Sequence, residues 1–108
     1  MKHKLYEQVK GSVLYHCEIS DEMLIGSNRE DVVDARCLLV CALAKCGLKD
    51  ADIAELTHLT RAGVCKLRNS FSMRGNRMFL ITWKRICSDV DSYMKQADNE
   101  ALYKCQML

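Results

Sequence analysis

The sequence that decides the fold is DADIAELTHLTRAGVCKLRN, residues 50–69. Its apolar residues fall mostly three or four positions apart on either side of a short polar break, which predicts two short helices joined by a tight turn. Each helix would bury one face against a third helix and leave the other in water. Five side chains are predicted to pin the helices, let them cross closely or fill the turn: Ile53, Ala54, Leu59, Val64 and Leu67.

This pattern is typical of the helix-turn-helix unit of bacterial DNA-binding proteins. In that unit the second helix lies in the major groove and its N-terminal residues meet base edges. Thr60 is a suitable N-cap for it. The turn often carries glycine at a position of positive φ; here that position is His58, a residue type enriched in that conformation. The side chains left to contact bases are Thr60, Arg61, Ala62, Cys65, Lys66 and Asn69.

The charges are divided unevenly along the chain, although the formal net charge is only +2. Between Leu56 and Ser88 there is no Asp or Glu, and this segment carries seven basic residues. The rest of the chain has nine basic and 14 acidic residues, a net charge of −5. A basic segment that begins at the predicted second helix favours nucleic acid as a partner, because phosphate attraction dominates such affinity.

Length and composition predict an all-α protein. The chain has 108 residues, no proline, five glycines and 49% apolar residues, which suits a bundle of about five to six helices with few sharp turns. We find no run of about 18 apolar residues and no signal-peptide pattern, so neither a membrane span nor export is indicated. The expected location is the cytoplasm.

Seven cysteines are spread along the chain. Their number is odd and several fall on apolar helical faces, so we expect small buried side chains rather than disulfides. The more specific alternative is zinc binding, for which His16 and the adjacent Cys17 are an isolated pair of candidate ligands. Because no C-x-x-C pair is present, we expect no metal site and no cofactor.

Two helices are expected in the N-terminal part of the chain. One spans residues 3–15, where apolar side chains repeat at helical spacing. The other is short and follows Ser20, which can cap it. Its side chains Met23, Leu24 and Ile25 are predicted to turn inward.

A long central helix is expected to end at Cys46. The run from Ser27 to Glu30 has the S-x-x-E pattern of a capping box at its start, and Gly47 is a natural stop. Every residue from Cys37 to Ala44 is apolar. A helix that is apolar on all sides is surrounded by others, so the two short helices are expected to pack against this one.

The last helix is expected to run from about Arg77 to Gln96 or beyond. Its apolar residues repeat at spacings of four and three and form a narrow stripe suited to helix pairing: Phe79, Trp83, Ile86, Val90 and Tyr93. The stripe would either pack on its own domain or form a homodimer interface. The expected division is therefore a helix-turn-helix domain of residues 1–74 and a C-terminal helix of residues 75–108.

The run EISDEMLIGSNREDVVDARCLLVCAL carries a short helix, an S-x-x-R loop and a long helix with V-x-x-A-R. In these features residues 9–69 resemble the DNA-binding C-terminal domain of the bacterial replication initiator DnaA, and more broadly the superfamily that includes the Trp repressor. At the second short helix the chain reads LTRAGV where the family has D-H-T-T-V. The resemblance implies the fold and DNA binding, but not replication initiation or the initiator's target sequence.

Basic residues elsewhere complete the expected contact set. The resemblance adds Arg29 as a contact to the DNA backbone or minor groove. It also adds Arg36 as a backbone contact, unless Arg36 pairs with an acid such as Asp34 or Asp52. Phosphate contacts that fix the register are expected from Lys49, Arg68, Arg74 and Arg77.

The expected function is sequence-specific binding of double-stranded DNA, as a transcriptional regulator or accessory factor, with residues 60–70 in the major groove. The alternative is a helical protein-interaction module that uses the aromatic residues of the C-terminal stripe. Paired carboxylates with suitable partners, a glycine-rich phosphate loop and a nucleophile elbow are all missing from the sequence. We therefore do not expect an enzyme.

Overall fold

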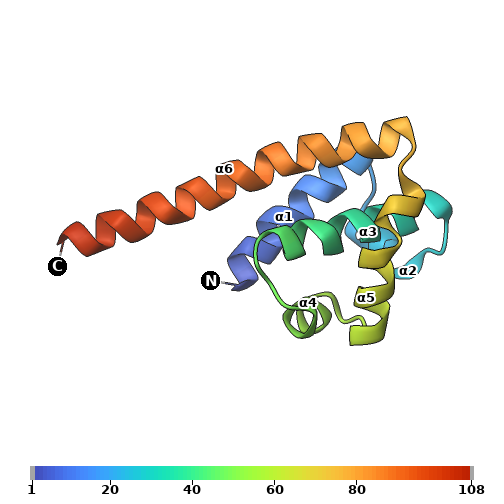
Figure 1. Ribbon diagram of the computed structural model, residues 1–108, viewed down its shortest axis with the longest axis horizontal. Coiled ribbons are helices and arrows are strands. Elements are labelled where there is room, and N and C mark those ends of the chain that lie inside the picture. The colour runs from blue at the N-terminus through green and yellow to red at the C-terminus, as the bar shows by residue number, and fades with distance from the viewer. Residues whose placement is uncertain (1, 108) are drawn as a thin grey trace.

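The computed structural model describes the backbone of residues 2–107 and the side chains of residues 2–96. All regular structure in that range is helical, which confirms the predicted all-α class (Figure 1). No helix in the described part is long and apolar enough to cross a membrane. The elements are α1 (Lys2–Cys17), α2 (Asp21–Gly26), α3 (Glu30–Lys45), α4 (Asp50–Thr57), α5 (Arg61–Asn69), the 3-10 turn η1 (Phe71–Arg74) and α6 (Arg77–Met107).

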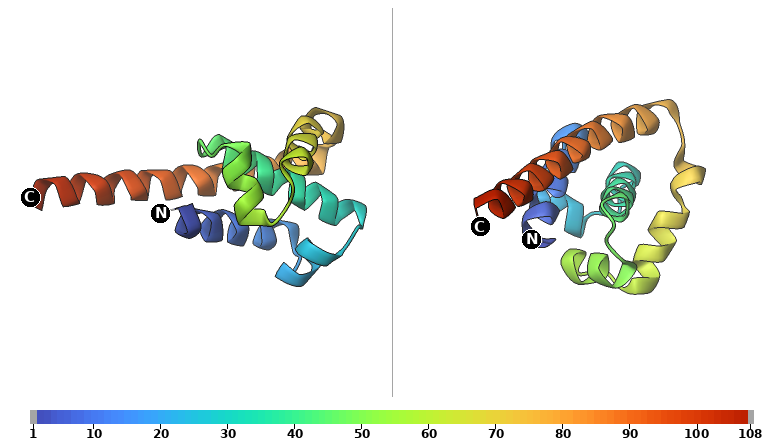
Figure 2. Two further views of the ribbon diagram at one scale, coloured as in Figure 1. Left: turned by 90° about the horizontal axis from the view of Figure 1, so that it is seen from below. Right: turned by 60° about the vertical axis from the view of Figure 1, so that its left-hand side comes forward.

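Helix α3 is the centre of the molecule. It contacts every other element, and the chain from α4 through α5 and η1 to α6 wraps around it (Figure 2, right). Six of the eight residues from Cys37 to Ala44 are buried, as predicted for a helix that is apolar on all sides. Burial of a side chain such as Leu38 or Leu43 contributes about 1.5–3 kcal/mol, so these contacts set the position of the surrounding helices.

The start of α3 differs from the prediction. The helix begins at Glu30 with Arg29 as its N-cap and without a side-chain cap, so Ser27 and Glu30 do not form a capping box. Instead Ser27 Oγ accepts a hydrogen bond from the Arg29 amide at 3.2 Å, which closes a turn ahead of the helix. At the other end Gly47 takes a φ of +93°, so the predicted stop is confirmed.

Helix α2 matches its prediction in part. The Ser20 side chain accepts a hydrogen bond from the Met23 amide at 3.2 Å and caps the helix as predicted. Leu24 is buried, but Ile25 is 75% exposed. A six-residue helix has room for only a narrow inward face, and that face holds Leu24.

Helix α6 packs on the body through its apolar stripe. Phe79, Ile86 and Val90 are buried, and Trp83 and Tyr93 are partly buried against the same core. The first half of α6 lies along α1 and α3 (Figure 1). The stripe therefore packs on its own domain, which was one of the two expected uses, and a homodimer through these side chains stays a prediction.

A polar contact also ties α1 to α6. Ser12 Oγ donates to Asp89 Oδ2 at 2.7 Å, and His16 Nε2 lies 2.9 Å from the same oxygen. The Ser12 hydrogen bond, with a smaller contribution from His16, lowers the pKa of Asp89. Both partners lie more than 70 residues away from Asp89 in the sequence, and local pattern reasoning did not find them.

Candidate nucleic-acid interface

Helices α4 and α5 form a pair that is seated on α3. Ile53 and Val64 are completely buried, while Ala54, Leu59 and Leu67 are partly buried against the same core. All five side chains therefore pack as predicted from the apolar spacing within residues 50–69. The pair has a fixed position, because α3 contacts both of its helices.

The turn between α4 and α5 uses a left-handed residue. His58 has a φ of +61°, so histidine occupies the conformation that glycine often supplies at such a turn, as predicted. Thr57 stabilises the same turn. Its hydroxyl donates to the Ile53 carbonyl at 2.6 Å and accepts from the Leu59 amide at 3.4 Å.

The N-terminus of α5 is capped and open to solvent. Thr60 Oγ1 accepts from the Gly63 amide at 3.0 Å, which confirms the predicted N-cap. A Cβ at Gly63 would lie only 3.1 Å from that oxygen, so glycine permits the close approach. Because Oγ1 acts as the acceptor in the cap, the hydroxyl hydrogen remains available to a group outside the protein.

The outer face of α5 contains most of the predicted base-contact residues. Thr60, Arg61, Ala62, Lys66 and Asn69 are exposed. No other residue with a described side chain makes a hydrogen bond or ion pair with the Arg61 or Lys66 side chain. Helix α6 lies on the other side of α3 and does not cover this face (Figure 2).

Cys65 is the exception among the predicted base contacts. It is half-buried, and its sulfur accepts a hydrogen bond from the Asn69 side-chain amide at 3.5 Å. Its position at the edge of the outer face makes it a weaker candidate than Arg61 or Lys66. Asn69 is exposed, but its amide is directed along the helix toward that sulfur.

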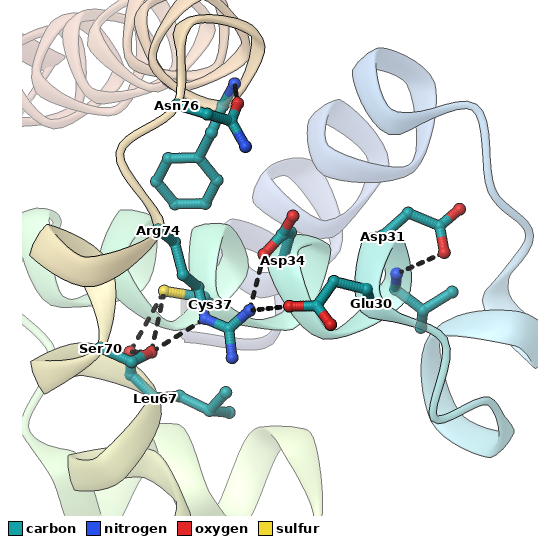
Figure 3. Close-up of polar contacts among 10 residues, drawn as sticks. Glu30, Asp31, Asp34, Cys37, Leu67, Ser70, Arg74 and Asn76 are labelled. Atoms are coloured by element: carbon teal, nitrogen blue, oxygen red, sulfur yellow. Dashed lines mark hydrogen bonds and ion pairs between the residues drawn. The ribbon is translucent and has the colours of Figure 1, made fainter.

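Arg74 is tied into the protein. Its guanidinium lies 2.7 Å from Asp34 Oδ1 and 3.7 Å from Glu30 Oε1, and its Nε donates to Ser70 Oγ at 3.2 Å (Figure 3). The side chain is only 22% exposed. Because its charge is already paired with carboxylates of α3, Arg74 is a weaker candidate for a phosphate contact than an exposed basic residue such as Lys49.

The same contacts reach the C-terminal end of α5. Ser70 Oγ donates to the Leu67 carbonyl at 2.8 Å, and the Cys37 thiol of α3 donates to that carbonyl at 3.1 Å (Figure 3). The hydrogen bond between Cys37 and Cys41 lowers the pKa of the Cys37 thiol and raises that of Cys41. The two hydrogen bonds to Leu67 provide partners for a carbonyl at the helix end, where carbonyls lack the usual intrahelical donor. Cys37, Ser70 and Arg74 together hold α5 on α3.

The remaining cysteines with described side chains are free and partly buried. Burial raises the pKa of Cys17 to about 11, with Asp34 and Asp31 adding to the effect, so this thiol is unreactive near neutral pH. Within the described residues no three His, Cys, Asp or Glu side chains come together as a metal site.

Arg36 binds backbone carbonyls of its own chain. Its Nε donates to the Leu24 carbonyl at 2.6 Å, and its Nη2 donates to the carbonyls of Ile25 and Ser27. The side chain therefore closes the end of α2 and the loop before α3. The alternative that Arg36 pairs with Asp34 or Asp52 is corrected, and its contact with the DNA backbone stays a prediction.

The other predicted phosphate contacts differ in how free they are. Arg68 lies 3.2 Å from Asp50 Oδ2, and the second oxygen of that carboxylate is buried without a hydrogen-bond partner. Arg68 is thus partly committed to joining α4 and α5. Arg29 is 66% exposed and lies 3.0 Å from Asp31. Lys49 and Arg77 are exposed.

Comparisons with protein-family models, curated proteins and solved structures found no match for this chain. The geometry of the site and the charges that it exposes are therefore the basis for assigning a function.

Proposed function

We propose that α4, its turn and α5 act as a helix-turn-helix that binds double-stranded DNA in a sequence-specific manner. The observation that carries the proposal is the outer face of α5. Arg61 and Lys66 are exposed there and make no ion pair with a described residue, on a helix that the core and the contacts of Arg74 hold in place. A rigid helix with free basic side chains suits the major groove, which admits an α-helix.

The residue types on this face suit base recognition. Arginine binds guanine through two hydrogen bonds, and a good pair of this kind contributes about 1–3 kcal/mol of discrimination. Arg61 lies in the first turn of α5, where base contacts occur in such units. Ala62 is small and apolar and fits against a thymine methyl group. The Thr60 hydroxyl can donate to a base or a phosphate.

Phosphate contacts are proposed for Arg29, Lys49, Arg77 and, in part, Arg68. Arg74 is assigned to positioning α5. The uneven charge supports this arrangement, because the segment with no acidic residue runs from Leu56, at the end of α4, through α5 and into α6. This arrangement is consistent with a transcriptional regulator or DNA-transaction accessory factor in the cytoplasm. It is also consistent with the resemblance to the initiator's DNA-binding domain.

A docking role for the aromatic stripe of α6 has less support. Phe79 is buried, and Trp83 and Tyr93 are partly buried against the chain's own core. A partner would have to displace these contacts before it could use them.

Selection of bound DNA from a pool of random duplexes tests the proposal. We expect one enriched motif whose recovery is lost with Arg61→Ala. A motif with two-fold symmetry and half-sites about 10 base pairs apart would show that the protein binds as a dimer. Recovery of random sequence by both proteins would contradict sequence-specific binding.

A further inference from the structure

The first half of α6 has an outer face on which basic and apolar side chains alternate. We define the α6 outer face by Arg77, Met78, Leu80, Ile81, Lys84 and Arg85. Met78 is 66% exposed and Leu80 is 41% exposed. No acidic residue lies within this stretch of the helix.

The charges of this face have no partner within the described part of the protein. No hydrogen bond or ion pair with another described side chain involves the side chains of Arg77, Lys84 or Arg85. The opposite side of α6 is fixed on the body by Phe79 and Ile86, which are buried. The helix therefore holds the α6 outer face toward solvent. Exposed large apolar side chains grouped with charges of one sign are typical of interaction sites.

The mixture of side chains indicates the class of partner. Nucleic acid would use the basic residues but would gain little from the exposed Met78 and Leu80. An anionic bilayer needs apolar side chains on one side of a helix. Met78 and Leu80 are two residues apart, so they lie about 200° apart around the axis, with the basic residues between them. The face therefore lacks the single apolar side that binding to a bilayer requires.

A second helix fits this surface better. Packed helices place the ridge of one into the groove of the other, along rows of residues three and four apart. Such rows run from Arg77 to Ile81 and from Leu80 to Lys84. Each row joins an apolar side chain to a basic one. Methionine adds a flexible, polarisable contact that adapts to its partner.

We propose that the α6 outer face is a docking site for an acidic amphipathic helix of a partner protein. The apolar side chains of that helix pack on Met78, Leu80 and Ile81. Its carboxylates pair with Lys84 and Arg85. Charge complementarity selects the partner, and the apolar contacts provide affinity. The α6 outer face shares Arg77 with the proposed phosphate contacts but lies apart from the outer face of α5. The docking contacts of Met78, Leu80, Ile81, Lys84 and Arg85 do not depend on DNA binding.

A designed peptide tests the proposal on the full chain. The probe is a fluorescent helical peptide with glutamate at every third or fourth position and leucine on either side of that row. Two control peptides replace its glutamates with lysine or its leucines with serine. We expect binding of the probe by fluorescence anisotropy, with both controls at least about tenfold weaker. Amide shifts in nuclear magnetic resonance spectra should fall on residues 77–85.

Variants decide whether this face is the one used. Lys84→Glu with Arg85→Glu, and separately Met78→Ser with Leu80→Ser, should each weaken probe binding at least about tenfold. The matched control is Arg61→Glu with Lys66→Glu, which reverses two charges on α5 and should leave probe binding unchanged. Circular dichroism confirms that each variant is folded.

Several results overturn the proposal. They are no binding of the probe, equal binding of the lysine control, or amide shifts that fall on α5. It also fails if Lys84→Glu with Arg85→Glu weakens binding to a DNA duplex or to vesicles of anionic phospholipid but leaves probe binding unchanged. That last result would assign the face to a nucleic acid or to a lipid surface instead.

Discussion

Two groups of basic side chains around α3 have opposite relations to the body of the protein. Arg61 and Lys66 are exposed on α5 and make no ion pair with a described residue. Arg36 and Arg74 lie against the body, one bound to backbone carbonyls and the other to carboxylates. The four residues carry the same charge, and only the first two offer it to a ligand.

The difference shows what a count of charges leaves out. Arg74 belongs to the basic segment between Leu56 and Ser88, yet Asp34 and Glu30 of α3 neutralise it in the folded chain. Charge in a segment attracts DNA only through side chains that the fold leaves unpaired. The free and the tied groups should therefore respond differently to mutation.

The largest effect is expected on DNA affinity. Arg61→Glu with Lys66→Glu places two negative charges on the outer face of α5 and should weaken duplex binding by about 100-fold. The free energy of unfolding should change by less than about 0.5 kcal/mol, as for surface sites without partners. Fluorescence anisotropy and urea unfolding measure the two quantities. A large loss of stability would show that these side chains have structural partners.

Arg36→Ala should give the opposite pattern. Removing the guanidinium leaves three backbone carbonyls without their donor, and the cost should be about 2–3 kcal/mol of unfolding free energy. DNA affinity, measured well below the melting temperature, should stay within about twofold of wild type. Lys49→Ala is the control, since Lys49 is exposed and predicted to bind phosphate. Normal stability of Arg36→Ala would contradict the structural role.

Arg74→Ala should lower stability by about 1–2 kcal/mol, because Asp34 loses its closest partner. The dependence of log affinity on log salt concentration tells a positioning residue from a phosphate contact. Loss of a phosphate contact reduces the slope by about 1, whereas we expect Arg74→Ala to leave it unchanged. A smaller slope would restore Arg74 to the phosphate contacts.

The smallest effect is expected at the contact between α1 and α6. The pKa of Asp89 is lowered in the folded chain, so its contribution is present above the unfolded pKa of about 4 and is lost as pH falls through the lower folded value. Its side chain is 40% exposed, so Asp89→Asn should cost less than about 1 kcal/mol at pH 7. Urea unfolding should show this difference disappearing at strongly acidic pH. A difference that persists there would assign it to another cause.

Local patterns predicted most of the fold. The spacing of Ile53 and Val64 located the α4–α5 pair, and the apolar run of α3 identified the central helix. Ser20 and Thr60 were recognised as caps because a cap depends only on residues within one turn. The S-x-x-E run was wrong as a capping box, since the chain enters α3 through Arg29.

Contacts between distant residues could not be read from the sequence. Asp34 and Arg74 are 40 positions apart, and Arg36 binds carbonyls, which every residue type provides. The sequence therefore predicted the exposed side chains of α5 correctly, but it did not reveal the internal contacts of Arg36 and Arg74. The apolar stripe of α6 allowed either internal packing or a dimer, and the internal packing became visible only with the positions of α1 and α3.

The most direct test of the central claim is the salt dependence of duplex binding by the wild-type chain and by Arg61→Ala with Lys66→Ala. If four to six phosphates are neutralised, the plot of log affinity against log salt concentration should have a slope of roughly −4 to −5. The double variant should bind more weakly, with a shallower slope. A wild-type slope near zero, or the same slope and affinity in both proteins, would contradict DNA binding through the outer face of α5.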